Sequence, residues 1–359
     1  MRRVFKNTSV LFFGKFVVAL CGFLSTMLLT RYLGAHAYSQ YAYVLTLTGT
    51  FFILADFGLS IHLIRSIAAN KTNAYQLQQV LTARLILSAV SLVLLLSYVN
   101  LVLTSAQLLL PLIIMSFFQI AQWLSLSYEA YLQGQQSFYK AVLPQILVAL
   151  LSLITVYIGM LFSFELSGIF SVLLIAQLCG LFVYMVTTKV YFLGKISFAA
   201  TLTLVKKVTP LAIGIILATL YFKVDGVLLG YFYPPTLRND LGIYAVAYKL
   251  FELSIVFSGY FIQALFPHLS SLQNTSSLQR ATKKYGLFIG CVALIISGLL
   301  YVCAPQLIYI TAGGEFVASV RVLRILAVAF APTLLAGFFM SVLLATKKMA
   351  YTYLQVLWH

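Results

Sequence analysis

Residues 29–43 read LTRYLGAHAYSQYAY and residues 229–246 read LGYFYPPTLRNDLGIYAV, two versions of one pattern. In each version an apolar segment ends in aromatic residues and a glycine-containing turn, and a second apolar segment begins at a Tyr-Ala pair. The copies lie about 200 residues apart, which indicates that the chain arose by duplication. In an apolar chain, a duplicated pair of helices is typical of transporters.

The composition excludes a water-soluble protein. Hydrophobic residues make up 62% of the chain, charged residues make up 8%, and the mean hydropathy is +1.02. Such a chain has too few polar side chains to cover a surface in water. We therefore predict an all-α, polytopic membrane protein. The four cysteines lack the spacing of metal ligands, so neither a metal nor another cofactor is expected.

Ten apolar segments are long enough to cross a bilayer. They are residues 10–32, 41–64, 80–98, 108–132, 141–162, 166–188, 209–230, 241–266, 286–303 and 322–345.

The basic residues predict a cytoplasmic N-terminus, because cytoplasmic loops retain Lys and Arg. Most of the 23 basic residues fall on one side of the ten spans: Arg2, Arg3, Lys6, Arg65, Lys71, Arg84, Lys140, Lys189, Lys195, Lys206, Lys207, Arg280, Lys283, Lys284, Lys347 and Lys348. Topology and contact with anionic membrane lipids account for these charges, so no nucleic-acid partner is expected.

The longest loop separates the two copies. We predict a six-helix bundle over residues 1–190, a cytoplasmic linker over residues 191–208, and a second bundle over residues 209–359. Since both copies begin in the cytoplasm, they are parallel repeats. At this repeat spacing the second set of helices is incomplete, and we expect the chain to end within the fifth helix of that set.

Ionisable residues within spans are costly in a bilayer and usually serve a function. In the first bundle these residues are Lys15 and Asp56, at similar depths. Lys15 can alternatively extend to the inner headgroups. Arg84 and Glu129 fall near span ends and are expected at the membrane interface.

In the second bundle the membrane-embedded charges come in matched pairs. Lys223 and Asp225 lie on one predicted helix, and Lys249 and Glu252 lie three residues apart on the next. A structural network of neutral pairs and a role in transport both fit this pattern. The sequence contains no P-loop, HExxH or GxSxG motif, so an enzyme is not expected.

Several short motifs resemble the bacterial oligosaccharide and polysaccharide flippases of the O-antigen type, which belong to the multidrug/oligosaccharidyl-lipid/polysaccharide exporter superfamily. They are TRYLG at 30–34, DFGL at 56–59, GIYAVAYK at 242–249, LFPHLS at 265–270 and GEF at 314–316.

The resemblance implies a multi-pass protein of the bacterial inner membrane with two bundles and alternating access. Its substrate would be an undecaprenyl-pyrophosphate-linked sugar repeat, flipped to the outer leaflet for lipopolysaccharide or other surface polysaccharide. Polysaccharide polymerase and chain-length proteins would be its partners.

The charged residues fit this substrate in part, because a pyrophosphate must be held by cations. The candidate cations are Lys15, Arg31, Lys223 and Lys249, and Arg31 can equally serve as an interface anchor. The candidates for coupling to an ion gradient are Asp56, Asp225 and Glu252.

Three alternatives remain open: a drug/cation antiporter of the same superfamily, a membrane polysaccharide polymerase or ligase, and an inactive truncated fragment. An antiporter should depend on acidic residues in its cavity and not on cations there. A polymerase or ligase needs catalytic residues on long outer loops, which the sequence lacks.

Overall fold

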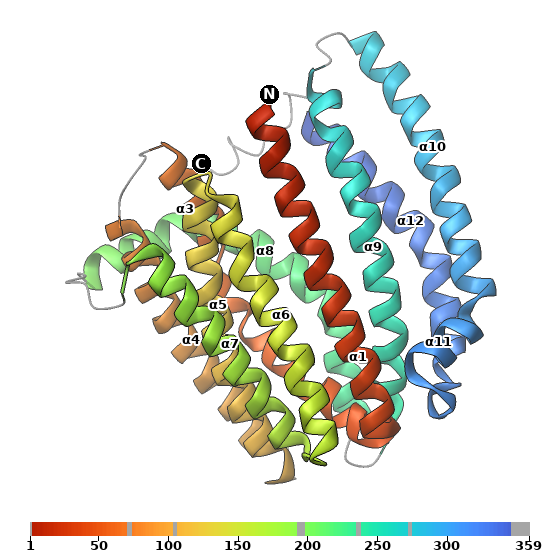
Figure 1. The fold of residues 1–359 in the computed structure, drawn as a ribbon. Helices are drawn as coiled ribbons and strands as arrows, with labels where there is room; N and C mark the ends of the chain where they lie inside the picture. Colours follow the sequence, from red (N-terminus) through yellow and green to blue (C-terminus); the bar gives the residue numbers. More distant parts are fainter. Residues whose placement is uncertain are drawn as a thin grey trace. The chain divides into compact units, whose positions relative to one another are not determined.

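The computed structural model describes residues 2–69, 74–102, 106–191, 198–234, 238–271 and 275–345, and these residues form helices and no strands. The predicted all-α class is confirmed (Figure 1). The helices are α1 (Arg2–Phe51), α2 (Ile53–Asp56), α3 (Leu59–Ala69), α4 (Ala74–Val102), η1 (Ala106–Leu108), α5 (Leu109–Gly134), α6 (Phe138–Leu161), α7 (Leu166–Thr188), α8 (Phe198–Phe232), α9 (Asp240–Ser271), α10 (Thr275–Val302), α11 (Ala304–Ala312), η2 (Gly314–Phe316) and α12 (Ser319–Ala345).

Each of the ten predicted spans falls on helical residues. Within the described residues, 8 helical stretches are long and apolar enough to cross a membrane. The longest stretch, Phe13–Ala69, contains the first two predicted spans. The chain is therefore a polytopic membrane protein, as its composition predicts.

The first predicted turn lies inside α1. Gly34 has φ 66° and ψ 179°, so it interrupts the helix, and helical residues continue directly after it. A positive φ is costly for residues with a Cβ, which explains why glycine occupies this turn. The following helical segment begins several residues before the predicted start at residue 41.

Three local features differ from the sequence prediction. The span 41–64 is not one helix: it breaks between α2 and α3, where Phe57 adopts a left-handed conformation with φ 44°. Residues 198–208, assigned to the linker, form the first turns of α8. The short helix α11, which has a proline in its first turn, was not predicted.

The chain divides into two compact units, Met1–Gly242 and Ile243–His359. The predicted linker at residues 191–208 separates two sequence repeats, whereas these units are defined by packing. The predicted division into repeats stays a prediction.

In the first unit, α1 packs along α6, and α7 packs against both α5 and α6 (Figure 1). The core joins apolar side chains of α3, α4, α5, α7 and α8, including Leu63 and Leu77. Two buried tyrosines of this core donate to backbone carbonyls: Tyr128 to Val190 at 3.0 Å and Tyr184 to Ala141 at 2.5 Å.

In the second unit, α10 and α12 pack side by side (Figure 1). Phe251 of α9 joins their core, which includes Ala293, Phe330 and Phe338. Large apolar side chains such as Leu287 point outward instead, with 73% of the side chain exposed. An outward apolar surface suits a lipid environment.

The two copies of the repeated passage contact each other within the first unit. Aligning their Tyr-Ala pairs makes Ser39 of α1 equivalent to Gly242 in the first turn of α9. The buried Ser39 hydroxyl accepts the Gly242 N–H at 3.1 Å and donates to the Arg238 carbonyl at 3.3 Å. Helix N-termini leave such N–H groups without a partner in their own helix, so Ser39 caps α9 from another helix.

Gly242 allows this close approach because it has no side chain. A Cβ at Gly242 would lie 2.9 Å from the Ser39 backbone nitrogen and 3.0 Å from the Ala35 carbonyl oxygen. Backbone atoms cannot rotate away, so a larger residue must push the helices apart. The tight contact thus joins two positions that are equivalent in the aligned passages.

We expect Gly242→Ala to destabilise the protein, because overpacking typically costs about 1–3 kcal/mol. The measurement is the melting temperature of the purified protein in detergent. Gly214→Ala on α8 is the matched control, since a Cβ there meets nothing within 4 Å. An equal change in the two variants would contradict the close contact at Gly242.

Candidate functional site

Lys15 of α1 lies between acceptors of two neighbouring helices. Its ammonium is 3.1 Å from Oε1 of Glu129 on α5 and 2.9 Å from Oε1 of Gln145 on α6. Gln133, one turn after Glu129, donates to the same carboxylate oxygen at 2.8 Å. The Lys15 side chain is 39% exposed, whereas that of Glu129 is 6% exposed. The pair therefore joins a buried anion to an accessible cation.

Arg84 of α4 forms a second ion pair, in which the cation is fully buried. One guanidinium nitrogen is 3.1 Å from Oδ1 of Asp56, and the Arg84 side chain has no exposed surface. The same nitrogen donates to the Ser60 hydroxyl of α3. The other terminal nitrogen donates to the Ser127 hydroxyl at 2.9 Å and to the Trp123 carbonyl, both on α5.

Two further contacts hold this cluster, and the buried Nε of Arg84 has no hydrogen-bond partner among the described residues. The Ser60 hydroxyl also donates to Asp56 at 3.2 Å, and the guanidinium carbon lies 5.6 Å from the centre of the Trp123 ring. An isolated charge in an apolar interior is strongly unfavourable, so the acceptors and the ring are needed to hold Arg84 there. The cluster ties α2, α3, α4 and α5 together.

Arg84 and Glu129, which the sequence places near span ends, both have buried side chains. Arg84 is the ion-pair partner of Asp56, and Glu129 is that of Lys15, although the sequence grouped Lys15 with Asp56. Both residues lie inside predicted spans. The criterion that selected Lys15 and Asp56, an ionisable residue within a span, could therefore also have selected them.

Lys223 and Asp225 lie on α8 in the first unit. A Cβ added at Gly49 of α1 would be 2.6 Å from the Lys223 ammonium and 3.8 Å from the side-chain nitrogen of Gln119 on α5. Gly49 thus leaves room for the ammonium. The Asp225 carboxylate accepts the N–H of Gly226 at 2.7 Å.

The remaining candidates lie apart from these clusters. Arg31 is exposed, three residues before the turn at Gly34. Lys249 and Glu252, in the second unit, pair on one face of α9 at 3.0 Å, with about equal exposure. Among the described residues, no group of three or more His, Cys, Asp or Glu side chains could hold a metal ion.

The two ion-pair clusters differ in what they can do chemically. Both terminal nitrogens of the Arg84 guanidinium contact groups within the protein, and the guanidinium is inaccessible to a ligand. The Lys15 ammonium has three N–H donors and is partly accessible, so an anion can compete with Glu129 for it. Lys15 is therefore the stronger candidate for an anion site, and Arg84 is a structural residue.

We expect Asp56→Asn to lower the free energy of unfolding by about 3–5 kcal/mol, because it leaves the fully buried Arg84 guanidinium without its counter-charge. Arg84→Met should cost somewhat less, about 1–3 kcal/mol, since the Asp56 side chain is 19% exposed and keeps the Ser60 hydroxyl as a donor. Denaturation of the detergent-solubilised protein measures both values.

Arg65→Met on α3 is the matched control, because Arg65 is exposed and its loss should change stability by about 0.5 kcal/mol or less. A cost for Arg84→Met no larger than for Arg65→Met would contradict a structural role for the cluster.

Comparison with solved structures identifies the fold. An inward-facing multidrug resistance MATE family transporter of the MOP superfamily matches with a TM-score of 0.63 and 14% identity, over 94% of this chain and 83% of that chain. A MATE protein in the bent conformation matches with a TM-score of 0.58 and 14% identity, over 95% and 82% of the two chains. An outward-facing MATE transporter gives a TM-score of 0.54 at 14% identity, over 92% and 84%.

At this identity the likeness concerns the fold alone. No curated protein matches the chain. The profile of a family described as polysaccharide biosynthesis protein matches residues 4–273, well over half of the chain. The chain belongs to this polysaccharide biosynthesis protein family, and it has the fold of the MATE transporters.

Proposed function

We propose that this protein is a flippase that moves an undecaprenyl-pyrophosphate-linked oligosaccharide from the inner to the outer leaflet for surface polysaccharide assembly. The observation that carries the proposal is membership in a polysaccharide biosynthesis family by a chain with a transporter fold. A membrane protein of this kind can contribute to polysaccharide synthesis by carrying a lipid-linked intermediate across the bilayer. The coarser conclusion, a multi-pass membrane transporter, rests on the family and fold together.

Lys15 is the proposed contact for the pyrophosphate. In the structure its charge is balanced by Glu129 at 3.1 Å, so an empty site holds no uncompensated cation. A pyrophosphate offers more negative charge and more oxygen acceptors than one carboxylate, and it can replace Glu129 at the exposed side of the ammonium. When the substrate leaves, the buried carboxylate takes the ammonium back. Glu129 thus favours release of the substrate and balances the charge of Lys15 when the site is empty.

The other cations have secondary roles in the proposal. Arg31 is exposed near the end of the first segment of α1 and would meet the pyrophosphate near the outer surface. Lys223 and Lys249 would contact the substrate from α8 and α9. Lys249 is paired with Glu252 by a contact between half-exposed groups, which is weak and easily exchanged.

Ion coupling is assigned to carboxylates. Asp56 already pairs with the buried Arg84 at 3.1 Å and accepts from Ser60, so its carboxylate is engaged within the protein. Asp225 is exposed on α8, and Glu252 is exposed on α9. We therefore place coupling at Asp225 first and Glu252 second, with Asp56 in a supporting role.

The proposal includes the arrangement expected from the sequence. The N-terminus is cytoplasmic, residues 1–190 and 209–359 are the two repeats, and the protein lies in a bacterial inner membrane beside the polymerase that receives its product. The glycan class, O-antigen or another surface polysaccharide, follows from the resemblance and not from any contact described above.

We expect Lys15→Ala to slow flipping about tenfold or more, because it removes a charge-assisted contact worth roughly 1.5–3 kcal/mol. Lys15→Arg should retain most activity, since it keeps the charge. The assay reconstitutes the protein in liposomes and follows a fluorescent undecaprenyl-pyrophosphate-linked oligosaccharide as it becomes accessible to an external glycosidase.

Lys140→Ala is the matched control, because it removes one exposed cation at the start of α6. Equal rates for Lys15→Ala and the unmodified protein would remove Lys15 from the site. Efflux of an organic cation by the same liposomes, without any flipping of the glycolipid, would instead favour the drug/cation antiporter.

We expect Glu129→Gln to bind the pyrophosphate more tightly but to turn over more slowly, because the competing carboxylate is lost. Binding of undecaprenyl pyrophosphate to the detergent-solubilised protein and the flipping rate in liposomes measure the two effects separately. Weaker binding in this variant would contradict the proposed exchange between carboxylate and pyrophosphate.

A further inference from the structure

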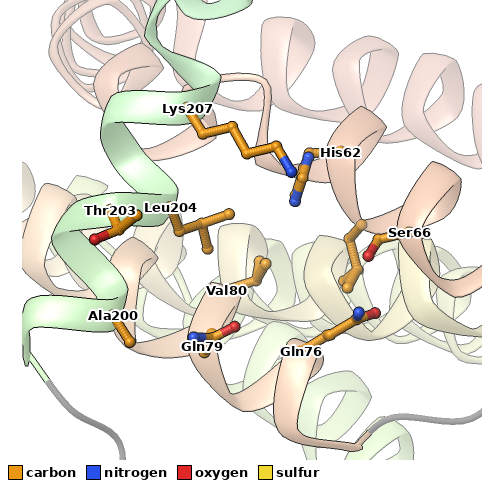
Figure 2. A pocket seen from close by; sticks show the side chains of 10 residues that line it. His62, Ser66, Gln76, Gln79, Val80, Ala200, Thr203, Leu204 and Lys207 are labelled. Atoms are coloured by element: carbon orange, nitrogen blue, oxygen red, sulfur yellow. The ribbon is translucent and has the colours of Figure 1, made fainter. Parts of the chain in front are cut away.

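A polar cavity of about 240 Å³ opens between α3, α4 and α8 in the first unit (Figure 2). Six of its ten lining side chains are polar: His62, Ser66, Gln76, Gln79, Thr203 and Lys207. The other four are Leu63, Val80, Ala200 and Leu204. None of the cations assigned to the transported substrate is among the lining residues. The cavity therefore needs an explanation of its own.

The electrostatic character of the cavity is positive. Figure 2 shows Lys207 extending from α8 toward the His62 ring on α3. No lining residue is acidic, and Arg65 is a further charged group near His62. Ala200 belongs to the first turn of α8, so the positive end of this helix dipole also lies at the cavity. These features favour an anion.

The cavity also contains a hydrogen-bond acceptor without a partner. The side-chain oxygen of Gln76 is buried, and it accepts no hydrogen bond from the described residues. A buried acceptor of this kind costs about 1–3 kcal/mol if it stays unsatisfied. A ligand that places a hydroxyl donor next to its anionic group would satisfy Gln76, which a simple counter-ion would not.

The size and position of the cavity limit the ligand further. Pockets that enclose whole small molecules have about 300–1,000 Å³, so this one fits a headgroup-sized fragment. Its apolar lining comes from Leu63, Val80 and Leu204, which also belong to the helix core. The cavity lies near the end of α3 and the beginnings of α4 and α8, where spanning helices reach the level of headgroups.

We propose that this cavity binds a phosphoryl group that carries a hydroxyl-bearing substituent, as in the headgroup of phosphatidylglycerol or in free glycerol phosphate. Lys207 and His62 hold the phosphate, Ser66 and the Gln79 amide donate to its oxygens, and Gln76 accepts from the substituent hydroxyl. The bound group joins α8 to α3 and α4 and thereby stabilises the first unit. The site is separate from the transported substrate and does not depend on the proposed flippase activity.

The test measures ligand binding and stability together. Protein in nanodiscs of phosphatidylcholine with 20% phosphatidylglycerol is compared with protein in pure phosphatidylcholine, and native mass spectrometry counts the phosphatidylglycerol molecules that stay bound. In a second arm, glycerol phosphate is titrated onto the protein in pure phosphatidylcholine. Lys207→Gln and His62→Gln should each lower affinity about tenfold, the effect of losing one charge-assisted contact.

Lys206→Gln is the matched control, because Lys206 is the exposed neighbour of Lys207 and does not line the cavity. Retention of phosphatidylglycerol without binding of glycerol phosphate would identify a lipid site, and binding in the second arm would identify a soluble ligand. Equal losses in Lys206→Gln and Lys207→Gln, or no binding in either arm, would overturn the proposal. Melting temperatures of all variants in phosphatidylcholine confirm that each remains folded.

Discussion

The buried guanidinium of Arg84 is the constraint on which the first unit depends. Moving a charge from water into an apolar interior costs several kcal/mol, so such a charge persists only with a matched set of acceptors. These acceptors come from three other elements: Asp56 ends α2, Ser60 lies in the first turn of α3, and Trp123 and Ser127 lie one turn apart on α5. Asp56 and Ser60 are four residues apart, and two left-handed residues, Phe57 and Gly58, lie between them. The Arg84 guanidinium therefore bridges the two sides of the helix break.

The Lys15 pair has the opposite character, and the difference explains why only one pair is proposed to bind substrate. In the Arg84 pair the cation is inaccessible and the anion is 19% exposed, whereas in the Lys15 pair the anion is buried and the cation is 39% exposed. A ligand that carries negative charge can reach only the second cation. Lysine also suits the exchange of one anionic partner for another. Its compact ammonium does not require the planar, two-point geometry with which an arginine binds a carboxylate.

The sequence predicts where the helices lie along the chain better than it predicts which helices pack together. The ten apolar runs fall on helices, and the glycine at position 34 locates the first turn, because both signals are local. The ion-pair roles of Arg84 and Glu129 were not predicted, because a position near a span end does not indicate which side chains lie beside it. Burial at those positions depends on which helix packs beside α4 and α5, and hydropathy carries no such information. The break at Phe57 and Gly58 was also missed: Phe57 is an uncommon residue at a positive φ, and a single glycine inside an apolar run does not by itself end a helix.

The contact between Ser39 and Gly242 joins equivalent positions of the two repeated passages. Backbone atoms lie within about 3 Å of any Cβ added at Gly242, so only glycine fits there without a shift. The two passages therefore differ at this position: one has a small polar residue, and the other has glycine. Ser39 uses the space so gained to accept the Gly242 N–H, which the first turn of α9 leaves without a helical partner. An identical pair could not do this, because two serines would clash and two glycines would leave that N–H without its acceptor.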